Sequence, residues 1–140
     1  MGTWGYKNFE NDTAQNFLGD LTDTGSIKMF RKVFNEAMGE ATCLEAPICL
    51  EALAAAELMC MITEGDIEAL PSSVIEWYNK GTGIFRKKIS FKNNELKKAA
   101  YTVEKIMTNS ELKDLWEESD EYSKWQENNE QLVNRLLSQI

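Results

Sequence analysis

The amino-acid sequence contains no histidine among its 140 residues. This absence excludes the Ser-His-Asp and Cys-His catalytic arrangements, histidine metal ligands and imidazole pH switches together. The sequence also lacks a P-loop, a dinucleotide-binding glycine fingerprint, an H-E-x-x-H zinc motif, an EF-hand and a G-x-S-x-G nucleophile elbow. We therefore expect no catalytic residues, no metal and no cofactor, and we interpret the chain as a binding protein rather than an enzyme.

Proline and cysteine are scarce, at two and three residues, while the hydrophobic share of 43% is that of an ordinary globular protein. A chain of this length forms one domain with its own core, so we expect a single domain over residues 1–140. The cysteines fit no zinc-binding spacing. Cys49 and Cys60 would lie about 16 Å apart on one helix, beyond the reach of a disulfide. We expect Cys43, Cys49 and Cys60 to be reduced and mostly buried.

No basic and apolar signal sequence opens the chain. The most apolar stretch, Ile48 to Ile62, contains Glu51 and Glu57. It is also shorter than the roughly 20 apolar residues that cross a bilayer as a helix. We therefore expect a soluble cytoplasmic protein that does not enter a membrane.

Apolar residues recur every three or four positions along most of the chain, which predicts helices. The segment of about 47–63 is apolar on nearly every face, which is typical of a buried central helix. The sequence therefore predicts an all-α bundle of six or seven short helices around this central helix. Capping and helix-breaking residues place the boundaries at Asn11-Asp12, Asp23 to Ser26, Gly39, Pro47, Glu64 to Asp66, Leu70 to Ser73, Gly81 to Gly83, Asn93-Asn94 and Thr108 to Ser110.

Three further predictions concern segments at the margins of this pattern. The aromatic residues of Met1 to Glu10 predict a lead-in that packs on the body of the protein. The segment Ile84 to Phe91 is predicted to be a basic loop. In the last two helices, the spacing predicts that Leu115 shares one side of its helix with Leu112 and Trp116, and that Leu137 and Ile140 belong to the apolar residues of the final helix.

The net charge is −8 and the sequence pI is about 4.6, which argues against a protein that binds nucleic acid through a basic surface. The charge is uneven along the chain: −8 over residues 1–75, +5 over 76–110 and −5 over 111–140. We interpret the basic block, which includes Arg86 to Lys88, as an internal counter-charge or a partner contact rather than a nucleic-acid site.

The densest acidic group lies just after position 110. Asp114, Glu118 and Glu121 follow one helical ridge, and Glu117 and Glu121 form a like-charge pair that destabilises an isolated helix. Two interpretations stay open, a solvated helix face or an acidic surface that docks a basic partner. The partner-binding candidates are Asp114, Glu117, Glu118 and Glu121 first, then Asp20 and Asp23 of the first predicted helix.

Glu51 and Glu57 interrupt the apolar segment, and a buried carboxylate pair can act as general acid and base. Their six-residue separation places them about 240° apart around a helix, so they face different directions. We therefore interpret them as carboxylates that cap neighbouring backbone groups. An enzyme centred on either carboxylate is the third and weakest hypothesis for the function.

The residues Trp4-Gly5 and Phe9 to Ala14 form a W-G…F-x-N-D-x-A opening. With the later segments, this opening resembles an uncharacterised bacterial domain family, a domain of unknown function, over most of the chain. The resemblance implies no enzyme activity. By analogy, small acidic proteins of this kind resemble immunity proteins of polymorphic toxin systems, including contact-dependent growth inhibition. The later matching segments are Leu44 to Ala46, Glu51 to Glu57, Ser110 to Leu112, Leu115 to Glu118, Tyr122 and Trp125.

Two functions from different classes follow from these observations. The first is an immunity protein whose acidic helix surface occupies the cationic cleft of a cognate toxin C-terminal domain, most simply a basic nuclease. It predicts a protein partner, with no direct contact to nucleic acid or membrane. The second is a non-catalytic structural or regulatory interaction module that forms a homo-oligomer through its Trp- and Met-rich surfaces.

Overall fold

The computed structural model describes residues 3, 5–23, 25–39, 44–80 and 89–140. In these residues the only strand-type contact is a single antiparallel bridge between Thr3 and Asn11. The prediction of an all-α protein is therefore confirmed. The elements are α1 (Asp12–Asp23), α2 (Lys28–Gly39), α3 (Ala46–Glu64), the short 3-10 helix η1 (Ile67–Ala69), α4 (Ser72–Lys80), α5 (Asn93–Thr108), α6 (Glu111–Glu117) and α7 (Tyr122–Ser138).

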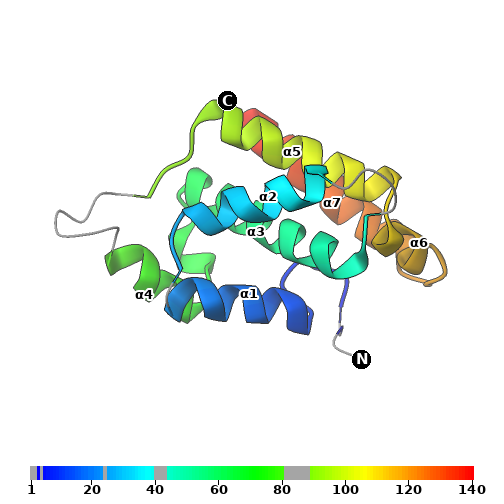
Figure 1. Cartoon of the computed structure of the whole chain (residues 1–140), viewed down its shortest axis with the longest axis horizontal. Helices are drawn as coiled ribbons and strands as arrows, with labels where there is room; N and C mark the ends of the chain where they lie inside the picture. Colours follow the sequence, from blue (N-terminus) through cyan, green and yellow to red (C-terminus); the bar gives the residue numbers. More distant parts are fainter. Residues whose placement is uncertain (1–2, 4, 24, 40–43, 81–88) are drawn as a thin grey trace.

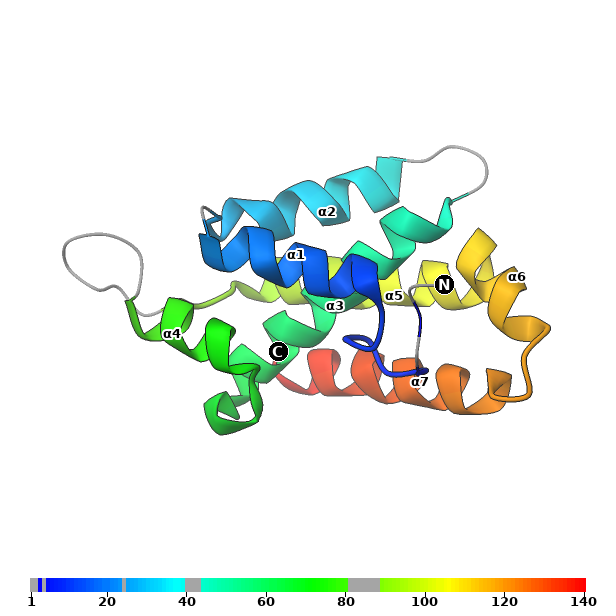
Figure 2. The same ribbon diagram turned by 90° about the horizontal axis from the view of Figure 1, so that it is seen from below.

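Helix α3 lies at the centre of the bundle (Figures 1 and 2). Helices α1 and α2 pack on one side of it, and the antiparallel helices α5 and α7 pack on the other. Ala54, Ala55 and Ala56 are fully buried, and such small side chains let several neighbouring helices approach closely in a densely packed core. The predicted central helix of about 47–63 is thereby confirmed.

The two ends of α3 follow the predicted signals. Pro47 occupies the first turn, where its missing N–H has no partner to lose. Gly65 closes the helix with a φ of 80°, a left-handed conformation that favours glycine, and its N–H donates to the Ile62 carbonyl at 3.1 Å. These two residues set the length of the central helix.

The length argument against a membrane helix does not hold for α3. The helix has 19 residues and is long and apolar enough to cross a membrane, because it extends beyond the stretch Ile48 to Ile62 at both ends. However, 67% of its most apolar 18-residue window is buried inside the protein. Burial by the surrounding helices is typical of the core helix of a helical bundle.

Capping residues explain where the flanking helices begin. The Asn11 side chain accepts a hydrogen bond from the Ala14 N–H at 2.7 Å, which confirms its predicted role at the start of α1. The predicted cap of α5 at Asn93-Asn94 is wrong by one residue. The boundary falls at Lys92, whose N–H donates to the Glu95 carboxylate at 3.3 Å, and both asparagines already lie in the first helical turn.

Three apolar side chains of the last two helices lie at the surface rather than in the core. Leu115, Leu137 and Ile140 are 56%, 46% and 44% exposed. Leu112 and Leu136 take the core positions of their helices, and the neighbouring helices cover only part of each apolar side. Periodicity predicts which side of a helix is apolar, but not how much of that side the fold covers.

The N-terminal lead-in packs on the bundle as predicted. Tyr6 and Phe9 lie against the core cluster, and Asn8 is buried. Cys49 and Cys60 are buried and not joined in a disulfide, as predicted. Cys43 and residues 84–88 of the predicted basic loop lie outside the described residues.

Candidate functional site

Helix α6 connects the antiparallel helices α5 and α7 at one end of the bundle (Figures 1 and 2). Ser110 defines this connection. Its hydroxyl donates to the Ile106 carbonyl in the last part of α5 at 2.6 Å and accepts from the Lys113 N–H in the first turn of α6 at 3.0 Å. One side chain therefore ends α5 and caps α6, as the sequence predicted for Ser110.

A second set of bonds fixes α6 against the start of α3. The Glu111 N–H donates to the Leu44 carbonyl at 2.9 Å, and the Glu111 carboxylate accepts from the Ala46 N–H at 2.8 Å. A carboxylate at a helix N-terminus satisfies a free backbone donor and complements the helix dipole. The charge of Glu111 therefore serves the fold rather than a partner.

The other acidic residues of the α6 region differ in how they are paired. Glu117 forms an ion pair with Lys113, and the hydrogen bond to Glu117 raises the pKa of the Lys113 amine. The Glu121 carboxylate lies 4.0 Å from the Lys124 amine. In the part of the chain that the structure describes, the side chains of Asp114, Glu118 and Asp120 make no ion pair or hydrogen bond, and all three residues are exposed. Asp114 lies on α6, and Glu118 and Asp120 lie in the turn that follows it; we call these three carboxylates the free acidic edge of α6.

An apolar cavity lies beside this acidic edge. Its volume is about 430 Å³. Leu115 is more than half exposed at its rim. Trp116 stacks on the buried Trp125, with ring centroids 6.2 Å apart and an angle of 11° between the planes. The cavity is lined by Thr3, Gly5, Leu112, Leu115, Trp116, Ser119 and Glu121. We call this cavity and the free acidic edge together the α6 site.

The predicted partner-binding residues do not form one patch. Asp114 and Glu118 belong to the α6 site, Glu121 lines its cavity, and Glu117 lies at the end of α6 in an ion pair with Lys113. Asp20 and Asp23 are exposed in the last turns of α1, near α4 and at the opposite end of the bundle (Figures 1 and 2). Sequence reasoning also missed Leu115 as a surface residue, and no sequence signal distinguishes it from the buried Leu112.

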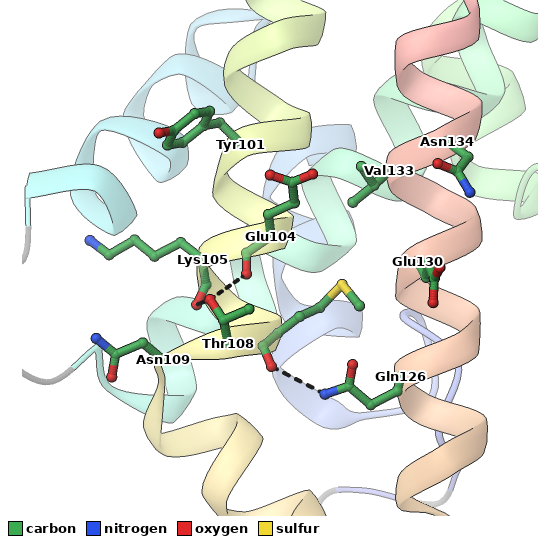
Figure 3. Close-up of a pocket in the computed structure, with 10 residues that line it drawn as sticks. Tyr101, Glu104, Lys105, Thr108, Asn109, Gln126, Glu130, Val133 and Asn134 are labelled. Atoms are coloured by element: carbon green, nitrogen blue, oxygen red, sulfur yellow. Dashed lines mark hydrogen bonds between the residues drawn. The ribbon is translucent and has the colours of Figure 1, made fainter.

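A larger open groove runs between α5 and α7, with a volume of about 680 Å³. Figure 3 shows Glu104 and Val133 pointing toward the space between the two helices, whereas Tyr101 and Lys105 point away from α7. The Gln126 amide spans the groove and donates to the Met107 carbonyl at 3.1 Å. The groove has a mixed polar lining without a concentrated charge, so it offers less to a charged partner than the α6 site.

Glu57 belongs to a network of ion pairs rather than to a catalytic pair. Its carboxylate accepts from Arg135 at 2.9 Å and from the Asn8 amide at 3.4 Å. The same guanidinium binds both oxygens of Glu64, at 2.8 and 3.0 Å, and these hydrogen bonds hold the pKa of the Glu64 carboxyl below its usual value. The prediction that Glu57 caps backbone groups is wrong, because its partners are side chains.

Glu51 faces the other way, toward α1 and α2. Burial raises the pKa of its carboxyl, and the negative charges of Glu36 and Asp20 add to this effect while Lys32 opposes it. Glu51 and Glu57 therefore face different directions, as the helical spacing predicted. No single site contains both, so the hypothesis of a paired-carboxylate enzyme loses its geometric basis.

Two other kinds of chemistry also lack support. Burial raises the pKa of the Cys60 thiol to about 12, which keeps it protonated and unreactive at neutral pH. Among the residues that the structure describes, no three cysteine, aspartate or glutamate side chains come together in a way that could hold a metal ion.

Comparison with known families places the chain in a defined group. The model of a family described as a domain of unknown function, DUF4259, matches residues 2–128, which include α6 and the first turns of α7. The chain therefore belongs to this family, and the prediction of an uncharacterised domain family is confirmed. No curated protein and no solved structure matches the chain.

Proposed function

We propose that this protein is a cytoplasmic immunity protein that binds and neutralises a cognate bacterial toxin domain, most simply a nuclease. The observation that carries the proposal is the α6 site, in which Asp114, Glu118 and Asp120 are exposed and unpaired in the described part of the chain. A nuclease binds phosphate through a cationic cleft, and exposed carboxylates on a rigid helix complement such a cleft.

The arrangement of charges supports a binding role for α6. Unpaired like charges on a short helix cost stability, because i and i+4 carboxylates repel one another. The fold compensates for this cost by tying the start of α6 to Leu44 and Ala46. A helix whose position is fixed and whose charges face solvent is preorganised for a partner, which lowers the entropy lost on binding.

The direct experiment is co-expression with the toxin encoded next to this protein in the genome. The proposal expects protection of the cells and a complex that can be isolated with the toxin domain. The absence of both protection and binding would contradict the proposal. The variant Asp114→Lys/Glu118→Lys should slow association with the toxin, and more so at low ionic strength, because both charges lie outside the core.

A matched control comes from the other end of the bundle. The variant Asp66→Lys/Glu68→Lys changes the net charge by the same amount, and both residues are exposed at η1, which lies away from α6. It should leave the association rate close to that of the unchanged protein. An equal loss of rate in both variants would show that net charge, rather than the α6 site, attracts the partner.

The alternative is a non-catalytic interaction module that forms a homo-oligomer. The specific observation in its favour is the exposure of Tyr101, Leu137 and Ile140, at 66%, 46% and 44%, on α5 and at the end of α7. Light scattering after size exclusion separates the two functions. A stable dimer that binds no toxin supports the alternative, and a monomer that binds the toxin supports the immunity function.

A further inference from the structure

We propose that the apolar cavity of the α6 site is the anchor point for one bulky apolar side chain of the partner, flanked in the partner segment by lysine or arginine. The inference deepens the proposed function, because it names the chemistry of the partner segment. It rests on that function only for the existence of a partner. It assigns Leu115 and Trp116 as binding residues beside the carboxylates.

The first argument is the environment of Leu115. An exposed leucine by itself is common on protein surfaces and carries no meaning. Here the side chain lies at the rim of a cavity of about 430 Å³ whose other apolar walls are Leu112 and Trp116. Burying a leucine-sized group in such a cavity removes apolar surface from water, which makes the cavity a suitable centre for an interface.

The second argument is the rigidity of the cavity floor. Trp116 is half-buried and stacks on Trp125, which is 1% exposed and packs in turn against Tyr122 with ring centroids 6.2 Å apart. Side chains held in this way lose little further freedom when a partner binds. Aromatic side chains in such settings are the usual centres of binding energy in protein interfaces.

The third argument is charge complementarity, which selects the occupant. Asp114 and Glu118 are i and i+4 neighbours on the exposed face of α6, and Leu115 lies at the margin of that face toward Leu112. Asp120 and Glu121 follow in the turn, and Glu121 itself lines the cavity. An apolar side chain can therefore enter the cavity while cationic neighbours meet the carboxylates around it. A neutral apolar segment would leave those carboxylates partly desolvated without partners.

The two kinds of contact have separate effects on binding. The carboxylates act at long range and raise the association rate in a salt-dependent way. The apolar anchor acts only after contact and slows dissociation. This division identifies which measurement reports on which residues.

The experiment uses the full chain and three synthetic peptides of equal length. The first has a phenylalanine between two pairs of arginines, the second has serine in place of phenylalanine, and the third has serine in place of the arginines. Affinity is measured by calorimetry, and the contact surface by amide shifts in nuclear magnetic resonance spectra. We expect the first peptide to bind most tightly and to shift the amide signals of Leu112, Leu115, Trp116 and Ser119.

The variant Leu115→Ser tests the anchor without disturbing the core, because this side chain is already exposed. It should weaken binding of the first peptide by roughly tenfold, as expected for the loss of one apolar contact. Binding of the serine peptide should not change. The control Leu137→Ser removes another exposed leucine, at the end of α7 away from α6, and should leave both affinities unchanged.

The inference would be overturned if the first peptide failed to bind, or if it bound no better than the second or third peptide. It would also be overturned if Leu115→Ser left the affinity of the first peptide unchanged, or if the amide shifts mapped to the groove between α5 and α7. Self-association that Leu115→Ser abolishes would also overturn it, because a second copy of this chain would then be the occupant.

Failure of the inference is distinguishable from failure of the proposed function. If the protein and its Leu115→Ser variant protect cells equally well against the toxin, the immunity function stands and the anchor is wrong. If the peptides behave as expected but the toxin is neither bound nor neutralised, the anchor stands and the immunity function is wrong.

Discussion

The carboxylates around Arg135 and those on α6 have the same chemistry but opposite surroundings. Glu57 and Glu64 lie on the central helix, with side chains 13% and 24% exposed, and both bind one guanidinium. Asp114 lies on the short peripheral helix α6 and Glu118 directly after its end, both exposed and without an ion-pair partner in the described residues. The difference indicates that the first group stabilises the fold, whereas the second is available to a partner.

The Arg135 cluster joins three segments that are distant in the sequence. Asn8, Glu57 and Arg135 come from the N-terminal lead-in, α3 and α7. A partly buried carboxylate is stabilised by such a partner and becomes costly without it. The α6 carboxylates carry no such cost, because water solvates them. Variants in the two regions should therefore separate stability from binding.

The largest effect is expected for Arg135→Met. This change leaves Glu57 and Glu64 without their cation and should lower the free energy of unfolding by about 2–4 kcal/mol. Urea denaturation followed by circular dichroism measures the loss. The double variant Arg135→Met/Glu57→Gln should recover part of it, because glutamine can still accept from Asn8 and carries no charge. If Arg135→Met lowered the free energy of unfolding by less than an ordinary surface variant does, the Arg135 cluster would contribute no more to stability than the exposed carboxylates at α6. The difference between the two groups would then be wrong.

A smaller effect is expected within α6 itself. Glu111→Ala should lower the free energy of unfolding by about 1 kcal/mol, because it removes the acceptor for the Ala46 N–H at the start of α3. Glu118→Ala, at the C-terminal end of the same helix and also exposed, should change it by less than about 0.5 kcal/mol. Thermal unfolding of the two variants makes the comparison directly. Equal effects would mean that the bond between Glu111 and Ala46 does not contribute to stability.

The pH dependence of stability sharpens the comparison further. The pKa of Glu64 is lowered in the folded protein, so its contribution is present above the unfolded pKa and is lost as the pH falls through the folded value. Unfolding free energy should therefore decrease as the solution is acidified below the ordinary glutamate pKa of about 4.3. When the unfolding free energy is measured at several pH values across this range, it should change less with pH for Glu64→Gln than for the unchanged protein. An identical slope in that variant would assign the acid sensitivity to other groups.

Glu51 should show the opposite sign and the smallest effect. Its folded pKa is raised, so its favourable contribution is present below the unfolded pKa and is lost as the pH rises through the folded value. Glu51→Gln should therefore raise the unfolding free energy at neutral pH, by less than about 0.5 kcal/mol. Urea denaturation at neutral pH measures the change, and a clear decrease would contradict the assigned surroundings of Glu51.

Local signals in the sequence were sufficient for most of the architecture. Asn11, Pro47, Gly65 and Ser110 lie at helix boundaries in the structure, as predicted. Each acts on backbone groups within a few residues, so its effect can be read without the fold. The same holds for the apolar segment of α3, whose composition alone requires burial.

The candidate site was predictable only in part. The acidic residues in and just after α6 are visible in the sequence, but their pairing is not. Glu117 and Glu121 have lysine partners, whereas Asp114 and Glu118 have none among the described residues. Leu115 looks like a core residue in the pattern and lies at the surface in the structure. The cavity beside it also requires the lead-in residues Thr3 and Gly5, which are far away in the sequence.

The sequence by itself determined the class of fold, the central helix and the positions of most helix ends, because these depend on neighbours within one or two turns. Only the tertiary structure decided which charges are paired, since Glu57 and Arg135 are 78 residues apart and Ala46 and Glu111 are 65 apart. Contacts over such separations depend on how the helices pack. The packing of the helices therefore decides which carboxylates form bonds that stabilise the bundle and which remain exposed to solvent.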